Sequence, residues 1–244
     1  VTQFQAQAYK ELLPADGPVR AQIMGAISPE KQDQAHRAKD FMNYQLMDQM
    51  KEYEPEFDQM LFYLPLTGST FKKVYYDELL GRAVSKFIQA EDLIVPYTAN
   101  SLDDADAIVH VIRMSKNDLR KQQVGGFYKD IELGEPPIDE SQIKSKQLEL
   151  EGVTANDQQR ESMYTILEVH TNLDLEDYPD VDENEEPTGI KLPYIITVEE
   201  ASQKVLSIRR NYEAEDPLKK KKNYFVQFKF LPGTGFYGFG LIHM

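Results

Sequence analysis

The chain has 244 residues, 41% of them hydrophobic, and a formal net charge of −14. This length allows one large domain or two small ones, and the hydrophobic fraction can build a core, which excludes global disorder. The absence of cysteine excludes disulfides, thiolate zinc sites and cysteine nucleophiles. No apolar run of about 18 residues is present, and the acidic balance argues against a surface that grips nucleic-acid phosphates.

Helices are predicted in the first quarter of the chain. Residues 3–13 form an amphipathic segment that Pro14 ends. Ser28 is a typical N-cap because Pro29 and Glu30 follow it. Apolar residues then recur at three- and four-residue spacing, so we expect one long helix that continues beyond Pro55 and packs its methionine-rich stripe into the core. The stripe consists of Ala35, Ala38, Met42, Leu46, Met50 and Tyr53, with Phe57, Met60 and Leu61 in the continuation.

The rest of the chain is predicted to be mainly strands. The segments with strand patterns are residues 70–76, 83–90, 92–97, 107–113, 163–175, the hairpin 192–198 and 204–209, and 224–231. One short helix follows the cap Ser115 and ends at Gly125, and residues 132–157 are predicted to be a polar loop with a further short helix. Because helices precede antiparallel strands, the predicted fold class is α+β.

These patterns divide the chain into three predicted regions. Residues 1–63 form an N-terminal helical region. Residues 64–235 form a mainly antiparallel β region with a mobile acidic loop near residues 174–188. Residues 236–244 begin a further helix after a glycine-rich turn. Because the chain ends on apolar residues, we expect it to be a segment of a longer protein.

The glycine-rich turn offers one candidate ligand site. Residues Gly233 to Gly238 match G-x-G-x-x-G directly after a predicted strand, a pattern that cradles a pyrophosphate when it opens a helix within a βαβ unit. Here the preceding strands are antiparallel and two aromatic residues occupy the variable positions. Packing of the aromatic residues against neighbouring structure is therefore the favoured interpretation, and a nucleotide-binding enzyme domain is the alternative.

The charged segments and the histidines are the other candidates for a ligand site, in the first place for metal binding. Asp180, Asp182 and Asn184 fit the first places of a calcium loop, but Glu185 and Lys191 stand where the loop needs glycine and glutamate. A solvated loop is therefore favoured over a calcium-stabilised extracellular module. The lysine run 219–222 is predicted to be solvated. The four histidines lack zinc-ligand spacing, and the two within strands are predicted to be structural. They are His36, His110, His170 and His243. No catalytic, cofactor-binding or metal-binding residue is therefore assigned, and no cofactor is expected.

Several runs of residues resemble one known family. They are residues 64–77 (LPLTGSTFKKVYYD), 112–121 (IRMSKNDLRK), 188–194 (TGIKLPY), 204–211 (KVLSIRRN), 215–220 (EDPLKK) and 228–243 (FKFLPGTGFYGFGLIH). Their order and spacing resemble the portal proteins, or head-to-tail connectors, of short-tailed tailed bacteriophages. The resemblance covers roughly residues 58–244 and more loosely the helical start.

The resemblance implies a structural protein of the virion and no enzyme activity. A portal is a homo-oligomeric ring, commonly a dodecamer, at one capsid vertex. It docks the terminase large subunit during genome packaging, contacts the major capsid or scaffolding protein, and joins tail adaptor proteins afterwards. Double-stranded DNA passes through its channel without sequence-specific binding, and no membrane is involved. The implied localisation is the virion, after assembly in the host cytoplasm, and this chain would form an N-terminal, wing-like segment.

Overall fold

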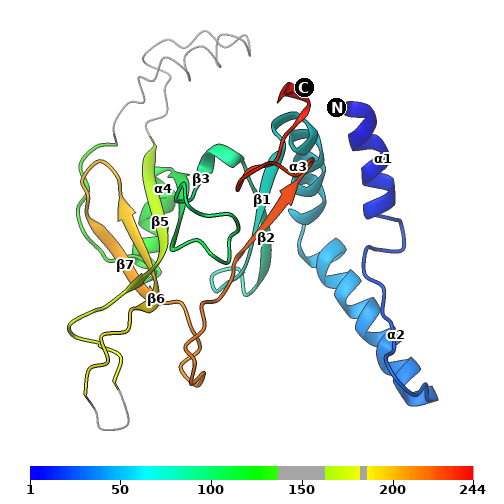
Figure 1. Cartoon of the computed structure of the whole chain (residues 1–244), viewed down its shortest axis with the longest axis horizontal. Helices are drawn as coiled ribbons and strands as arrows, with labels where there is room; N and C mark the ends of the chain where they lie inside the picture. The colour runs from blue at the N-terminus through cyan, green and yellow to red at the C-terminus, as the bar shows by residue number, and fades with distance from the viewer. Residues whose placement is uncertain (137–162, 182–185, 244) are drawn as a thin grey trace. The chain divides into compact units, whose positions relative to one another are not determined.

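The computed structural model describes residues 1–136, 163–181 and 186–243 (Figure 1). These residues form an α+β structure, as the sequence predicts, and they contain four α-helices and two antiparallel sheets. Within the described residues, no helix is both long and apolar enough to cross a membrane. The predicted short helix in residues 132–157 falls mostly outside the described residues.

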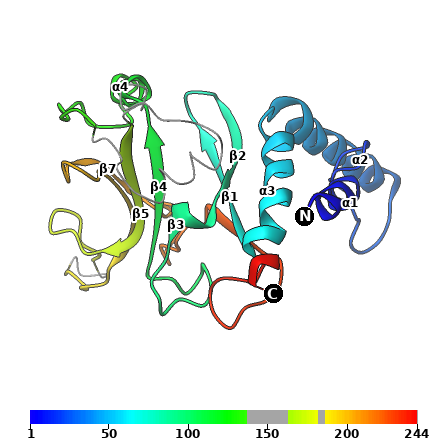
Figure 2. The same cartoon turned by 90° about the horizontal axis from the view of Figure 1, so that it is seen from above.

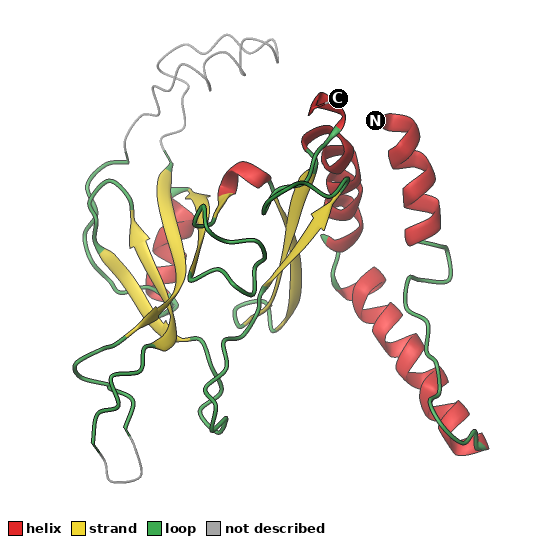
Figure 3. Cartoon of the chain, in the orientation of Figure 1, coloured by secondary structure: helices red, strands yellow, loops and turns green. Residues whose placement is uncertain are grey.

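The chain divides into two compact units. Unit 1 contains Val1–Glu91, Ala99–Asp104 and Asn223–Met244, and unit 2 contains Asp92–Thr98 and Ala105–Lys222. Both ends of the chain therefore belong to unit 1, and the predicted boundary at residues 63/64 lies inside it. Of the four α-helices in the described residues, three precede the first strand; Figure 3 distinguishes the helices (red) from the strands (yellow).

The N-terminal helices of unit 1 are α1 (Thr2–Leu12), α2 (Pro29–Tyr44) and α3 (Tyr53–Thr67). The Oγ atom of Ser28 accepts a hydrogen bond from the amide of Lys31 at 3.3 Å, so the predicted N-cap of α2 is confirmed. Figure 2 shows α3 lying between the β-strands of unit 1 and α1.

The prediction of one long helix is wrong. A π-helical turn, Gln45–Gln49, follows α2, and the chain leaves helical geometry at Met50 before α3 begins. The methionine-rich stripe is correspondingly split in two. Met50 and Met60 are buried, but α2 buries none of its residues against the described part of the chain, and Met42 is 49% exposed. Apolar periodicity predicted core packing for the whole stripe, but only the part from Met50 onward is buried.

The sheet of unit 1 has the strand order β2-β1-β8. Its strands are β1 (Ser69–Asp77), β2 (Arg82–Ile88) and β8 (Phe225–Lys229). Both β2 and β8 pair antiparallel with β1, and β8 comes from the far end of the chain. Helix α3 packs on this sheet, with Met60, Leu61 and Phe71 almost completely buried.

The sheet of unit 2 has the order β3-β4-β5-β6-β7 and is antiparallel throughout. Its strands are β3 (Leu93–Ile94), β4 (Ala107–Met114), β5 (Tyr164–Leu173), β6 (Leu192–Glu199) and β7 (Val205–Arg210). The helix α4 (Lys116–Val124) packs on one face of this sheet. Leu119 of α4 contacts a cluster that includes Tyr128, Tyr164, Ile166 and Leu206.

The predicted strands agree with these elements except between residues 90 and 97. There a 3₁₀ turn, Ala90–Asp92, precedes a strand of two residues. The hairpin of β6 and β7 is confirmed, with an irregularity in the ladder at Thr197/Val198. Residues 236–240 form a loop, and a single 3₁₀ turn, Leu241–His243, follows it.

Candidate functional site

The glycine-rich segment after β8 crosses the junction between α3 and β1 at backbone contact distance. Gly68 ends α3 with a φ of +84°, a conformation that glycine adopts without strain. A Cβ atom on Gly68 would lie 2.3 Å from the amide nitrogen of Gly240. A Cβ atom on Gly240 would lie 2.4 Å from the carbonyl oxygen of Leu66. The glycines therefore allow two backbone segments to touch where any side chain would separate them.

Aromatic side chains and hydrogen bonds fix this crossing. Phe236 stacks on Phe71 with ring centroids 5.8 Å apart, and Tyr237 meets the edge of the same ring. The amide of Gly238 donates to the Oγ atom of Ser69 at 2.7 Å. Burial raises the pKa of the Tyr237 hydroxyl. Phe236 is therefore buried, as the favoured interpretation from the sequence expects, whereas Tyr237 and Phe239 are each 44% exposed.

The same geometry removes the structural basis for a dinucleotide site at Gly233 to Gly238. The strand that precedes the turn is antiparallel to its neighbour, and residues 236–240, directly after the first glycines, form a loop. A phosphate site of this class needs a helix N-terminus after the glycines. A Cβ atom on Gly233 would also lie 2.1 Å from the carbonyl oxygen of Tyr237, so this glycine packs against its own turn instead of leaving room for a ligand.

A buried lysine lies between α3 and the sheet of unit 1. Lys72 is 4% exposed, and its ammonium group lies 4.5 Å from the ring centre of Tyr53 and 5.0 Å from that of Phe57. Its Nζ atom has no hydrogen-bond partner among the described residues. Burial lowers the pKa of Lys72 to about 8, and the nearby carboxylates of Glu56 and Glu52 oppose that shift. Sequence reasoning missed this lysine because alternation along β1 does not show which ring lies opposite it.

The carboxylates of α3 also bind the outer strand β2. Glu52 forms a bidentate ion pair with Arg82, with N–O distances of 2.7 and 2.8 Å. The Arg82 hydrogen bond lowers the pKa of Glu52. Glu56 accepts a hydrogen bond from the backbone amide of Phe87, and burial raises its pKa. These contacts satisfy the outer edge of β2 and support a structural role for the cluster.

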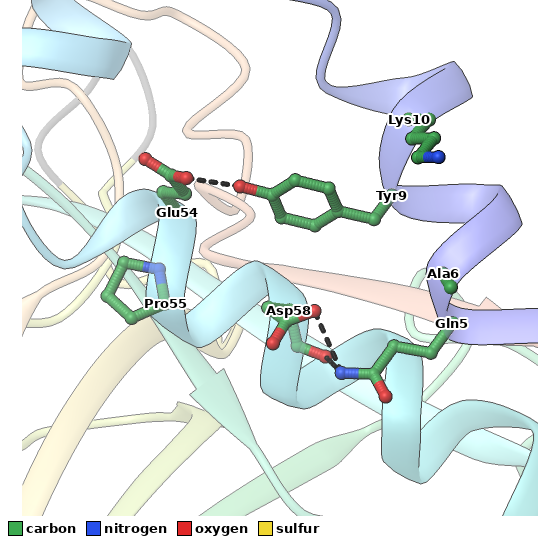
Figure 4. A pocket seen from close by; sticks show the side chains of 7 residues that line it. All are labelled: Gln5, Ala6, Tyr9, Lys10, Glu54, Pro55 and Asp58. Atoms are coloured by element: carbon green, nitrogen blue, oxygen red, sulfur yellow. Dashed lines mark hydrogen bonds between the residues drawn. The ribbon is translucent and has the colours of Figure 1, made fainter. Parts of the chain in front are cut away.

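A groove of about 530 Å³ lies between α1 and α3 (Figure 4). Tyr9 donates a hydrogen bond to Glu54, and this bond raises the pKa of Tyr9 to about 12. The Nε2 atom of Gln5 donates to the Oδ1 atom of Asp58 at 2.8 Å. In Figure 4 both pairs span the groove from one helix to the other. Because α1 buries no residue against the described chain, these polar pairs are its main links to α3.

The two histidines within strands both lie near one carboxylate, that of Glu168. In the register of the unit 2 sheet, His110 of β4 lies opposite Glu168 of β5, two residues from His170 on the same face. The Nε2 atom of His170 lies 2.8 Å from the Oε1 atom of Glu168, and both side chains are buried. Among the described residues no group of three or more such side chains is arranged to hold a metal ion.

The acidic loop and the lysine run meet each other. Lys219 pairs with Asp180, which also accepts a hydrogen bond from Thr188, and these two bonds lower the pKa of Asp180. Lys222 pairs with Glu213. The lysine run is therefore partly engaged in ion pairs instead of being wholly solvated. Asp182 and Asn184, the other residues of the calcium-loop hypothesis, lie outside the described residues.

Comparison with known proteins gave no match for this chain, either to a family model or to a curated protein.

Proposed function

We propose that this chain is a subunit segment of a bacteriophage portal ring, the channel through which the genome enters and leaves the capsid. The support begins with six sequence runs whose order and spacing resemble those of portal proteins. The α+β organisation, with helices first and antiparallel strands afterwards, is compatible with a wing-like segment.

One structural observation supports the proposal most directly. The runs 64–77 and 228–243, which both carry the resemblance, pack against each other although some 150 residues separate them in sequence. Strand β8 pairs with β1, and the glycines after β8 contact the backbone around Gly68. Two motifs that form one packed unit are expected to be retained together, which explains why they occur together in this chain.

The acidic charge of the chain fits a conduit for DNA. With a net charge of −14, the chain offers little attraction for phosphates, as a channel needs if DNA is to slide. In this proposal ATP hydrolysis belongs to the terminase. The ring is commonly a dodecamer, and it contacts the terminase, the capsid or scaffolding protein and the tail adaptors in turn.

Negative-stain electron microscopy of the complete gene product tests this function. Annular particles with a central hole about as wide as a DNA duplex are the expected result, and class averages count the subunits. Compact particles without a hole, at every protein concentration tried, would overturn the proposal.

A further inference from the structure

The last part of the described chain packs on unit 1 as a segment with internal contacts of its own. Residues 223–243, which we call the arm, follow unit 2 in sequence and contain β8 and the glycine-rich segment. The backbones of Leu231 and Phe239 exchange hydrogen bonds of 3.2 and 2.9 Å. The Nε2 atom of Gln227 donates to the carbonyl oxygen of Phe236 at 2.7 Å. The arm therefore holds part of its conformation through its own residues.

The arm completes the sheet of unit 1. Strand β8 lies beside β1 and pairs with one of its edges, whereas β2 occupies the other edge (Figure 1). Phe71 of β1 is 0% exposed, and Phe236 of the arm stacks on its ring. Ser69 accepts the hydrogen bond from the amide of Gly238. Without an arm, this edge of β1 would be open and Phe71 would lose its cover. We call β1 together with Gly68 the seat of the arm.

A closed and strained loop, residues 211–222, joins β7 to the arm. The amide of Lys222 donates to the carbonyl oxygen of Asn211 at 3.0 Å, and the Nδ2 atom of Asn211 donates back to the carbonyl oxygen of Lys222 at 3.3 Å. Within the loop Lys219 has a φ of +46°, a left-handed conformation that costs energy for a residue with a Cβ atom. Strain in a hinge loop favours the exchange of the segment that follows it, because opening the loop releases the strain.

The length of this loop sets how far the arm can move. In the closed form the ends of residues 211–222 lie within hydrogen-bond distance of each other. Fully extended, a segment of this length spans about 40 Å, which exceeds the diameter of a small domain, about 30 Å. An open loop therefore lets the arm reach the seat of a neighbouring copy, with no change in the arm or in the seat.

We infer that in the assembled protein the arm of each copy occupies the seat of the next copy. This inference rests on the proposed function, because it names the subunit contact of the proposed ring. The occupant is the arm itself, so every contact between copies is one that the chain already makes within unit 1. Exchange of an identical element is a low-cost route to oligomers. Arm and seat are different surfaces, so the contact is heterologous and closes into a ring when the rotation permits.

Paired cysteines test the exchange, because the chain has no cysteine of its own. Ser69 of β1 lies opposite Lys229 of β8, at a position without mutual backbone hydrogen bonds, where the Cα atoms are close enough for a disulfide. The complete gene product with Ser69→Cys and Lys229→Cys is oxidised and then denatured without reductant. We expect a ladder of covalent multimers. The matched control is Val74→Cys with Ser85→Cys, which pair across the β1–β2 hairpin of a single copy and should give only monomers.

A second measurement uses the unsubstituted chain. Ordinary and ¹⁵N-labelled copies are unfolded together, reassembled and treated with an amine cross-linker. The Cα atoms of Lys229 and Lys86 lie about 16 Å apart by the strand spacing and register of the sheet, within reach of such a reagent. Exchange predicts that cross-links between an ordinary and a labelled copy are as frequent as those between two copies with the same label.

The outcomes separate the exchange from the proposed function. Monomers alone from the Ser69–Lys229 pair, or cross-links without mixed labels, would overturn the inference and show that each arm closes on its own copy. Covalent multimers from the Val74–Ser85 control as well would also overturn it, because that hairpin cannot span two copies. Annular particles whose Ser69–Lys229 disulfides lie within single copies would refute the exchange and leave the portal function standing. Covalent multimers with no annular particles would support the exchange and refute the portal function.

Discussion

Gly68 is the position where the packing of unit 1 depends most on the absence of a side chain. Gly68→Ala places a Cβ atom within 2.3–2.6 Å of three backbone atoms of the glycine-rich segment, at Gly240, Phe239 and Gly238. The new methyl group also has to adopt a φ of +84°. Backbone atoms cannot rotate away as a flexible side chain can, so the segment after β8 must move.

Two separable costs make up the expected effect. A non-glycine residue at positive φ costs about 1 kcal/mol. Forcing an extra methyl group into a packed site costs about 1–3 kcal/mol. The total is about 2–4 kcal/mol. Gly81→Ala isolates the first cost, because Gly81 has a φ of +63° and no atom within 4 Å of its Cβ position. Gly240→Ala isolates the second, because the clash at Gly240 involves Leu66 and Gly68 without a positive φ.

Native-state hydrogen exchange is the suitable assay, since it reports the two units separately. Amides of β1 and β8 should lose protection in Gly68→Ala and Gly240→Ala, whereas amides of β5 and β6 in unit 2 should not. In Gly81→Ala the loss should be limited to about 1 kcal/mol. If Gly68→Ala destabilised unit 1 no more than Gly81→Ala, the backbone crossing would not contribute to stability and the reasoning would be wrong.

Three further predictions concern buried and bridging polar groups. The pKa of Lys72 falls from 10.5 to about 8 on folding, so the contribution of Lys72 to the free energy of unfolding should be lowest below pH 8 and rise towards pH 10.5. Lys72→Met should remove that rise and stabilise unit 1 at pH 7 by about 1–3 kcal/mol in denaturant titrations. A pH profile that is the same in Lys72→Met and wild type would contradict this. A double-mutant cycle of Glu168→Ala and His170→Ala should give a coupling free energy of about 1–3 kcal/mol. Strict additivity of the two single changes would show that the contact between these side chains does not contribute to the free energy of unfolding. Tyr9→Phe should accelerate hydrogen exchange of α1, whereas Tyr44→Phe on exposed α2 should not, and equal rates in wild type and Tyr9→Phe would refute the role of the bridge to α3.

Local signals in the sequence predicted much of the fold. Both serine caps, Ser28 and Ser115, accept hydrogen bonds from the amides three residues later. Alternation predicted β1, β4, β5 and the β6–β7 hairpin to within a few residues. These features depend on residues close in sequence, where capping chemistry and side-chain periodicity act directly.

Features that depend on distant partners were not predictable in the same way. The apolar spacing of α2 is the same whether a core lies beside it or not, so core packing was predicted for a helix that buries nothing. No local signal shows that β8 pairs with β1, or that strand register brings His110 opposite Glu168. The short strand β3 is likewise limited by pairing with only two residues of β4.

The late arrival of β8 in the sequence has a consequence for synthesis on the ribosome. Unit 2 ends at Lys222, so all of its described strands are synthesised before β8 is. Until then one side of β1 has an open row of amides and carbonyls, which is a template for wrong pairing with another nascent chain. The hairpin of β1 and β2 therefore lacks its second partner until residues 225–229 are made, and a chain truncated near Asn223 would contain all of unit 2 but would leave one edge of β1 unpaired.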